Sequence, residues 1–384
     1  MTTPRQMPID HPGTFIAEEL KSRVWAQADL AYILGMDDTQ LNKLIKGKTD
    51  ITPDTAVALG DAFDMPAEFF MNLQNAFDLL RAKKADPGVL KRARLSVFPI
   101  REMIKRGWIE DSEPALLDLQ IIRFFNKKKI EDIPFVSDAP ILPYAAKKGN
   151  YKRNYDETTP AQYAWLHRVR KIAESMDCPL YSETELRNRL RSIRAHMLDT
   201  DDLIHIPTIL SKCGVRFVLV EALLGSKIDG VCVWLDEQPV IGMTLRMNRP
   251  DNFCFVLRHE IEHILRGDGK DETFSPVDVL DGDKKDNSLP ECERLANEAA
   301  GEFCVPRALL DSFLARKGSF ISERDILNIS ARVEINPSVV VGQIQYRTNK
   351  YGLLRKYQTS IKEKLLAWKY TDGWDNFAPT GTGL

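Results

Sequence analysis

Cysteine and histidine are both scarce in this chain of 384 residues, which has only six of each. The cysteines are scattered, and none belongs to a C-x-x-C pair of the kind found in redox sites and zinc ribbons. Isolated cysteines favour reduced thiols over a disulfide framework, and reduced thiols are typical of the cytosol. We therefore expect a cytoplasmic protein that is held together by its core and not by cross-links.

The chain also lacks a strong charge of either sign and a long hydrophobic run. Its 53 basic and 55 acidic residues give a formal net charge of -2 at pH 7, so any attraction to nucleic acid must come from a local surface. No apolar run approaches the length of a membrane span, and the N-terminus has no signal segment. A hydrophobic content of 43% and a charged content of 28% predict an ordinary globular protein that does not contact membranes.

Two of the few histidines lie close together in an apolar stretch, in the pattern H-E-x-x-H at His259, Glu260 and His263. Residues at this spacing lie on one face of a helix, so both imidazoles can bind a single metal ion. Glu260 would lie beside that ion and could take a proton from a metal-bound water. The alternative is a core helix that carries two histidines by chance. A third ligand would help to decide between them.

A third ligand is available in a second expected helix within residues 291–306, whose alanines would allow close packing on the first. Glu293 and Asn297 lie on one face of it. Two histidines and one carboxylate around a tetrahedral zinc leave the fourth position for water, which is the catalytic arrangement. Asn297 could then orient a ligand side chain, and manganese would also accept this ligand set. The competitors of Glu293, which otherwise form a solvated acidic face, are Glu291, Glu298 and Glu302.

Both stretches resemble the ImmA/IrrE family of metallopeptidases, through the patterns H-E-[IL]-x-H-[IL]-L and E-x-x-A-N-x-x-A-x-x-F-x-[VL]-P. The resemblance implies a zincin fold with three metal ligands, which are His259, His263 and Glu293. It also implies that Glu260 is the catalytic base. The family usually has a small residue where this chain has Glu262. We expect Glu262 to be a solvated helix position; the alternative is a carboxylate that crowds the cleft and puts turnover in doubt.

The first 82 residues predict consecutive short helices, with Gly35 in a tight connection between the second and the third. The third helix begins after Asp37, an expected cap. Two helices joined by a short glycine turn have the form of a helix-turn-helix, whose second helix enters the DNA major groove. The outward side chains that suit contacts with bases and phosphates are Thr39, Gln40, Asn42, Lys43, Lys46 and Lys48. A small helical bundle with an ordinary polar face is the alternative.

The segments at 30–35, 41–47 and 51–56 resemble the lambda-repressor-type helix-turn-helix of HigA-like antitoxins, and the stretch 69–80 is similar to the last helix of that domain. The resemblance implies double-stranded operator DNA as a partner and a homodimer on a palindromic site. Together with the peptidase resemblance, it implies a protein partner as well. That partner is either a substrate, which would be a repressor or an antitoxin, or a cognate toxin.

The segments outside the two motifs carry weaker signals. Residues 83–185 predict a helical linker, and the metallopeptidase core is expected at 186–315. Strand-like runs within this core lie at 215–220, 230–235 and 239–244, the last two joined by a hairpin turn. Val240 to Thr244 is our candidate for the edge strand on which a zincin substrate is added as a further strand, with an ordinary sheet strand as the alternative.

The last part of the chain is expected to be helical at 316–384, with a polar tail from Thr371 to Leu384 that frays. The acidic connection between the two metal-binding helices, 267–290, predicts a solvated loop, with a lid as the alternative.

The sequence therefore predicts an α+β protein, mostly helical, in four parts. These are a five-helix helix-turn-helix domain at 1–82, a helical linker region at 83–185, a minimal zincin domain with a small sheet at 186–315, and a helical segment at 316–384. The predicted function is a DNA-binding transcriptional regulator or antitoxin of a toxin-antitoxin or phage-related system, with a zinc-dependent endopeptidase domain that cleaves a regulator protein. The alternative is a non-cleaving antitoxin or autorepressor, whose zincin-like domain binds a toxin or senses a ligand or metal.

Overall fold

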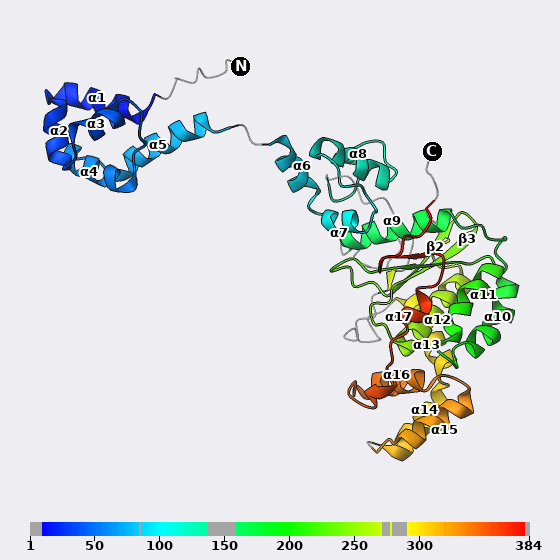
Figure 1. Ribbon diagram of the computed structural model, residues 1–384. Helices are drawn as coiled ribbons and strands as arrows, with labels where there is room; N and C mark the ends of the chain where they lie inside the picture. Colours follow the sequence, from blue (N-terminus) through cyan, green and yellow to red (C-terminus); the bar gives the residue numbers. More distant parts are fainter. Residues whose placement is uncertain are drawn as a thin grey trace. The chain divides into compact units, whose positions relative to one another are not determined.

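The computed structural model describes residues 10–83, 86–136, 158–270, 277–278, 290–318 and 320–380. The chain divides into two compact units, Met1–Asp86 and Pro87–Leu384 (Figure 1). The finer division into four parts stays a prediction. None of the helices in the described ranges is long and apolar enough to span a membrane. The cysteines are free thiols, as the sequence predicted.

The smaller unit is built from short helices that pack around one apolar core. They are α1 (Pro12–Arg23), α2 (Gln27–Leu34), α3 (Asp38–Ile45), α4 (Pro53–Phe63) and α5 (Ala67–Arg81). The Asp37 carboxylate caps α3 by accepting the N–H of Gln40 at 2.7 Å. Gly35 ends α2 with a left-handed φ of 66°, which gives the tight connection that the sequence indicated. The predicted helix-turn-helix domain of five helices is confirmed.

The larger unit contains one sheet and a set of surrounding helices. The helices before the sheet are α6 (Pro87–Leu95), α7 (Ile100–Lys105), α8 (Pro114–Phe124), α9 (Pro160–Glu174), α10 (Glu183–Ala195) and α11 (Ile206–Lys212). Those after its first three strands are α12 (Pro250–Arg266), α13 (Glu291–Cys304), α14 (Arg307–Lys317), α15 (Glu323–Val333), α16 (Pro337–Thr348) and α17 (Lys362–Leu365). Short 3₁₀ helices lie at Ile130–Asp132, Asp202–His205 and Arg355–Tyr357.

The strands form a mixed sheet in the order β4-β2-β3-β1-β5. They are β1 (Arg216–Val220), β2 (Gly230–Leu235), β3 (Gln238–Met243), β4 (Val277–Asp278) and β5 (Thr371–Asp372). β2 and β3 form the predicted antiparallel hairpin, and Asp236 in its turn has a φ of 54°. β3 also pairs in parallel with β1 along its other side. The prediction that Val240 to Thr244 form an edge strand is therefore wrong, because β3 is paired on both sides.

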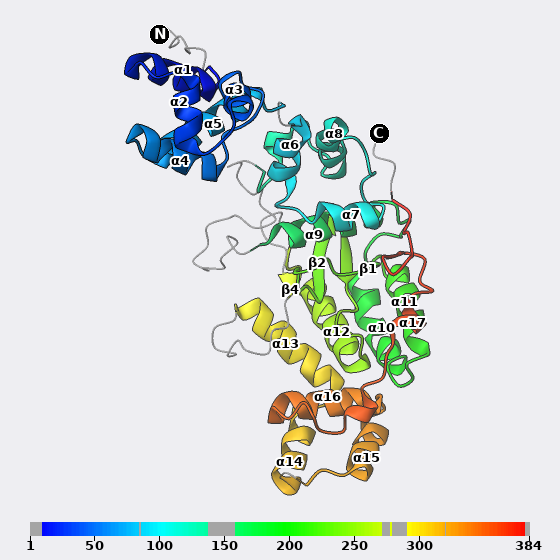
Figure 2. The same ribbon diagram turned by 60° about the vertical axis from the view of Figure 1, so that its left-hand side comes forward.

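Helices cover both faces of the sheet, which explains why its strands are apolar on both sides. Figures 1 and 2 show α9 on one face and α12 on the other. Trp165 and Val169 of α9 are fully buried. Gly242 of β3 lets α9 approach, because an added Cβ would lie 2.7 Å from a methyl group of Val169. Residues 83–185, expected as a linker, thus contribute a helix to the sheet core.

The tail is part of the fold from Thr371 to residue 380, contrary to the prediction that it frays; the rest of the predicted tail, 381–384, lies outside the described residues. Thr371 and Asp372 form β5, which pairs in parallel with β1. The Asp372 carboxylate is fully buried and accepts hydrogen bonds from Arg168 Nη2 at 2.7 Å and from Trp108 Nε1 at 2.6 Å. The sequence suggested a solvated tail because Arg168, the ion-pair partner of Asp372, lies 204 positions away along the chain.

The connection at 267–290, for which we considered a lid, lies largely outside the described residues. Of its middle part only Val277 and Asp278 are described, and they pair with β2 as β4. The lid alternative therefore stays a prediction.

Candidate metal centre

Helix α12 places both histidines of the H-E-x-x-H pattern on its buried side. His259 and His263 have exposed fractions of 1% and 0%. Pro250 lies in the first turn, where its missing N–H costs nothing. Gly267 ends the helix in a left-handed conformation with a φ of 72°. The apolar side chains that anchor α12 in the core include Val256, Leu257, Ile261 and Ile264.

Helix α13 supplies the third side chain from beside α12. Its small residues Ala296 and Ala300 are fully buried, and their size lets the two helices lie close together. Glu293 is buried as well, with 3% of its surface exposed. The three competing glutamates are all exposed; they are Glu291, Glu298 and Glu302. Glu293 is therefore the member of this acidic set that α13 directs toward the histidines.

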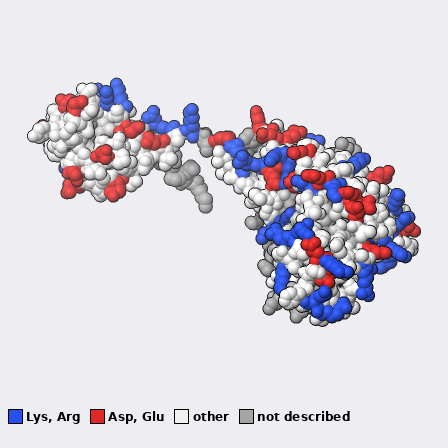
Figure 3. Space-filling model, turned by 60° about the horizontal axis from the view of Figure 1, so that its bottom comes forward, with Lys and Arg blue, Asp and Glu red and all other residues white. Residues whose placement is uncertain are grey.

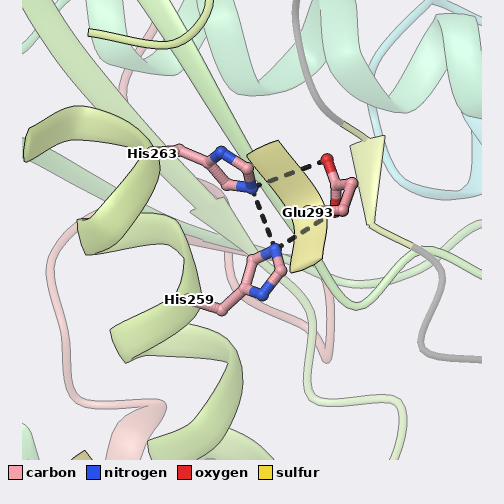
Figure 4. Close-up of side chains that lie close together, drawn as sticks. All are labelled: His259, His263 and Glu293. Atoms are coloured by element: carbon pink, nitrogen blue, oxygen red, sulfur yellow. Dashed lines mark hydrogen bonds and ion pairs between the residues drawn. The ribbon is translucent and has the colours of Figure 1, made fainter. Parts of the chain in front are cut away.

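The side chains of His259, His263 and Glu293 point toward one another from the two helices (Figure 4). The two Nε2 atoms lie 2.9 Å apart. The Glu293 carboxylate lies 3.4 Å from Nε2 of His259 and 3.6 Å from Nε2 of His263. Two atoms that each bind a tetrahedral zinc at about 2.1 Å lie roughly 3.4 Å apart. The separations and the donor atoms therefore both fit a single zinc ion.

Asp268 also reaches this centre, and the sequence reasoning missed it. Its Oδ2 lies 2.9 Å from Nδ1 of His263, on the side of the ring away from His259. Gly267 reverses the chain at the end of α12, so Asp268 returns to the last turn of its own helix. An acidic residue directly after the glycine that ends a metal-binding helix is the signal that could have revealed it.

Glu260 lies against the sheet. Its side chain is fully buried. A Cβ added to Gly230 in β2 would clash with Glu260 Oε1 and would lie 2.6 Å from Cγ1 of Val256. Glycine at this position therefore provides the space in which the Glu260 carboxylate lies.

Glu262 is held by a neighbour on its own helix. Its carboxylate accepts a hydrogen bond from Arg258 Nη2 at 2.7 Å. The side chains of Arg258 and Glu262 are 9% and 20% exposed, and Arg258 also lies over the Phe303 ring at 5.3 Å. Glu262 is thus part of a largely buried ion pair and not the solvated residue that the sequence suggested.

Asn297 is half-buried on α13, one turn after Glu293. Its Oδ1 accepts no hydrogen bond from the described residues. Its role in orienting a metal ligand therefore stays a prediction.

In the smaller unit, the predicted DNA-contacting residues lie on and just after α3. Thr39, Gln40, Lys43, Lys46 and Lys48 are exposed, and Asn42 is half-buried. Their outward faces leave Leu41 and Leu44 in the core. In the larger unit, by contrast, basic and acidic side chains are interspersed over the face drawn in Figure 3. The exposed lysines on and just after α3 are consistent with a local DNA-binding surface.

Comparisons with known proteins match both units. The helix-turn-helix family model matches residues 16–70, and the model of the IrrE N-terminal-like domain, peptidase M78, matches residues 217–344. Virulence-associated protein I of Dichelobacter nodosus is 34% identical over 80 residues, which are 21% of this chain and 74% of that protein. A solved addiction module antidote protein of the HigA family from Coxiella burnetii is 35% identical, covers 19% of this chain and 80% of its own, and has a TM-score of 0.19.

The matched ranges contain the motifs described above: α3 lies within the first, and the histidines of α12 and Glu293 lie within the second. The chain belongs to the helix-turn-helix family of DNA-binding proteins through its smaller unit and carries an IrrE-like peptidase domain of family M78 in its larger unit.

Proposed function

We propose that this protein is a DNA-binding regulator whose larger unit is a zinc-dependent endopeptidase. The observation that carries the proposal is the buried convergence of His259, His263 and Glu293 next to Glu260. Two imidazole nitrogens and one carboxylate leave a tetrahedral zinc with one open position, which is the arrangement of catalytic and not structural zinc sites.

In this proposal the metal is held by Nε2 of His259, Nε2 of His263 and the carboxylate of Glu293. When bound, zinc would activate water and polarise a peptide carbonyl. Glu260 would accept the proton of the attacking water at its carboxylate and pass it to the nitrogen of the departing amine. Burial of Glu260 beside Gly230 keeps its carboxylate in one place, so it needs no reorganisation during the reaction.

We further propose that the substrate is another regulator protein, either a repressor or antitoxin or a second copy of this chain. The relative from Coxiella burnetii is described as an antidote protein, and this chain joins a DNA-binding unit of its own to a peptidase domain. Cleavage of a DNA-bound regulator would couple proteolysis to transcription. A homodimer on a palindromic operator is part of the same proposal.

Elemental analysis is the first test. Purified full-length protein is expected to contain about one zinc per chain, and His259→Ala and Glu293→Ala are expected to lose it, because each removes one of three protein ligands. His205→Ala is the matched control, since His205 is an exposed histidine outside the centre. Manganese in place of zinc would revise the metal. Absence of any bound metal after purification without chelators would overturn the peptidase proposal.

Replacing Gly230 with alanine is expected to lower peptide cleavage by about 10²-fold, because displacing a catalytic group by ~1 Å costs roughly that much. Zinc content should stay unchanged, since the change acts on Glu260 and not on a ligand. Gly352→Ala is the control, because an added Cβ there meets nothing within 4 Å. Cleavage and zinc content are measured on the same samples; wild-type cleavage by Gly230→Ala would contradict the proposed placement of Glu260.

The DNA-binding part is tested with a duplex that the wild-type protein selects from a random pool. Lys43→Ala and Lys46→Ala are each expected to reduce the salt slope of binding by about 1, as for the loss of one phosphate contact. Gln40→Ala is expected to cost about 1–3 kcal/mol at one base pair. Lys21→Ala, exposed on α1, is the control. Equal salt slopes for Lys43→Ala, on α3, and Lys21→Ala would exclude α3 as the contacting helix.

A further inference from the structure

In the turn that follows α12, both backbone polar groups of Asp268 are hydrogen-bonded. The Asp268 N–H donates to the carbonyl of His263 at 2.9 Å, which closes the turn onto the helix. The Asp268 carbonyl accepts the indole N–H of Trp234 from β2 at 3.0 Å. The turn is therefore attached to the helix on one side and to the sheet on the other.

Trp234 is itself held in place. It is 9% exposed and meets the Tyr181 ring edge to face at 5.5 Å. Lys270, two residues after Asp268, lies 5.5 Å from the Trp234 ring centroid and pairs with Glu237 of the β2–β3 turn at 2.6 Å. These contacts attach the segment from Asp268 to Lys270 to the β2–β3 hairpin. The position of the Asp268 side chain thus depends on a residue of the sheet.

The hydrogen bond from this turn determines which nitrogen of His263 is available. A carboxylate only accepts hydrogen bonds, so at the 2.9 Å contact Nδ1 of His263 carries the hydrogen. In the neutral ring, Nε2 is then the atom with the free electron pair. That atom faces Nε2 of His259 and the Glu293 carboxylate. Asp268 therefore sets the ring in the tautomer and orientation that a metal requires.

We propose that Asp268 is a positioning residue for His263, and that Trp234 holds Asp268 in place from the sheet. This inference rests on the proposed metal centre and deepens it. Partners of this kind raise the basicity of a metal-binding histidine, and their removal typically weakens metal affinity by about 10–100-fold. The competing interpretation is a purely structural ion pair, because Arg266 Nε lies 3.6 Å from the same Asp268 oxygen.

Zinc affinity, measured by chelator competition on the full-length protein, separates the two interpretations. Asp268→Ala and Asp268→Asn are expected to bind zinc about 10–100-fold more weakly. Trp234→Phe keeps an aromatic ring at this position but removes the indole N–H. A smaller loss of zinc affinity, at most about 10-fold, is therefore expected. Arg266→Ala, which removes the other partner of Asp268, is expected to change the affinity by less than about 2-fold. Wild-type affinity in Asp268→Ala would overturn the inference.

The tautomer of His263 is a readout that needs no metal. In metal-free protein with ¹⁵N-labelled histidine at pH 8, two-bond correlations are expected to show Nδ1–H for His263, because Nδ1 faces the Asp268 carboxylate. The signal is assigned with His263→Gln. Nε2–H in the wild type would overturn the inference. A wild-type protein that shows Nδ1–H and binds no zinc would instead overturn the proposed peptidase and leave the hydrogen bond established.

Discussion

Replacing Glu260 with glutamine is expected to slow peptide cleavage by about 10²–10⁴-fold, the usual contribution of a general base. Glutamine has the same shape but cannot take up the proton of the attacking water. Zinc content is expected to remain at the wild-type level, because Glu260 is not among the three side chains that converge. Cleavage is measured by mass spectrometry on a mixture of synthetic peptides with zinc-loaded protein.

Glu262→Gln is the matched control for this substitution. It makes the same chemical change on the same helix, at a carboxylate that is bound to Arg258. Its cleavage rate is expected to stay within a few-fold of the wild type. Undiminished cleavage by Glu260→Gln would remove Glu260 as the base. A wild-type protein that holds zinc and cleaves no peptide would favour the non-cleaving antitoxin or the metal sensor.

The parts of the centre that could be predicted are those set by spacing along one helix. His259 and His263 lie on one face because of the helical repeat alone. Glu293 was chosen over Glu291, Glu298 and Glu302 because it shares a helix face with Asn297, and the resemblance supported the choice. Burial now distinguishes it from them. Asp268 was missed because its contact with His263 requires the reversal of the chain at Gly267, which the helical spacing that identified the histidines does not describe.

Strand order was the weakest part of the prediction, because it does not follow from local patterns. The runs that form β2 and β3 read almost alike, since both are buried on both faces. Which of them lies nearer to the edge depends on the second partner of each: β3 pairs with β1, whereas β2 pairs with β4, a two-residue strand from the connection after α12. The turn between β2 and β3, which has a local signature, was predicted correctly.

Replacing Asp372 with alanine is expected to destabilise the larger unit by about 3–5 kcal/mol, the cost of breaking a buried ion pair on one side. The change would leave Arg168, whose side chain is 8% exposed, without its carboxylate. It would also leave the Trp108 indole N–H and the Ala378 amide without their acceptor. Urea unfolding of the full-length protein, followed by tryptophan fluorescence, is expected to show a lower midpoint.

Asp375→Asn is the control for this prediction, because Asp375 is exposed in the same tail and asparagine tolerates its positive φ of 67°. The double variant Arg168→Ala, Asp372→Ala is expected to lose less stability than the sum of the two single variants, since it leaves no buried charge unpaired. A midpoint for Asp372→Ala equal to that of Asp375→Asn would mean that the tail contributes nothing to the core. The sequence-based expectation of a frayed end would then describe the protein in solution.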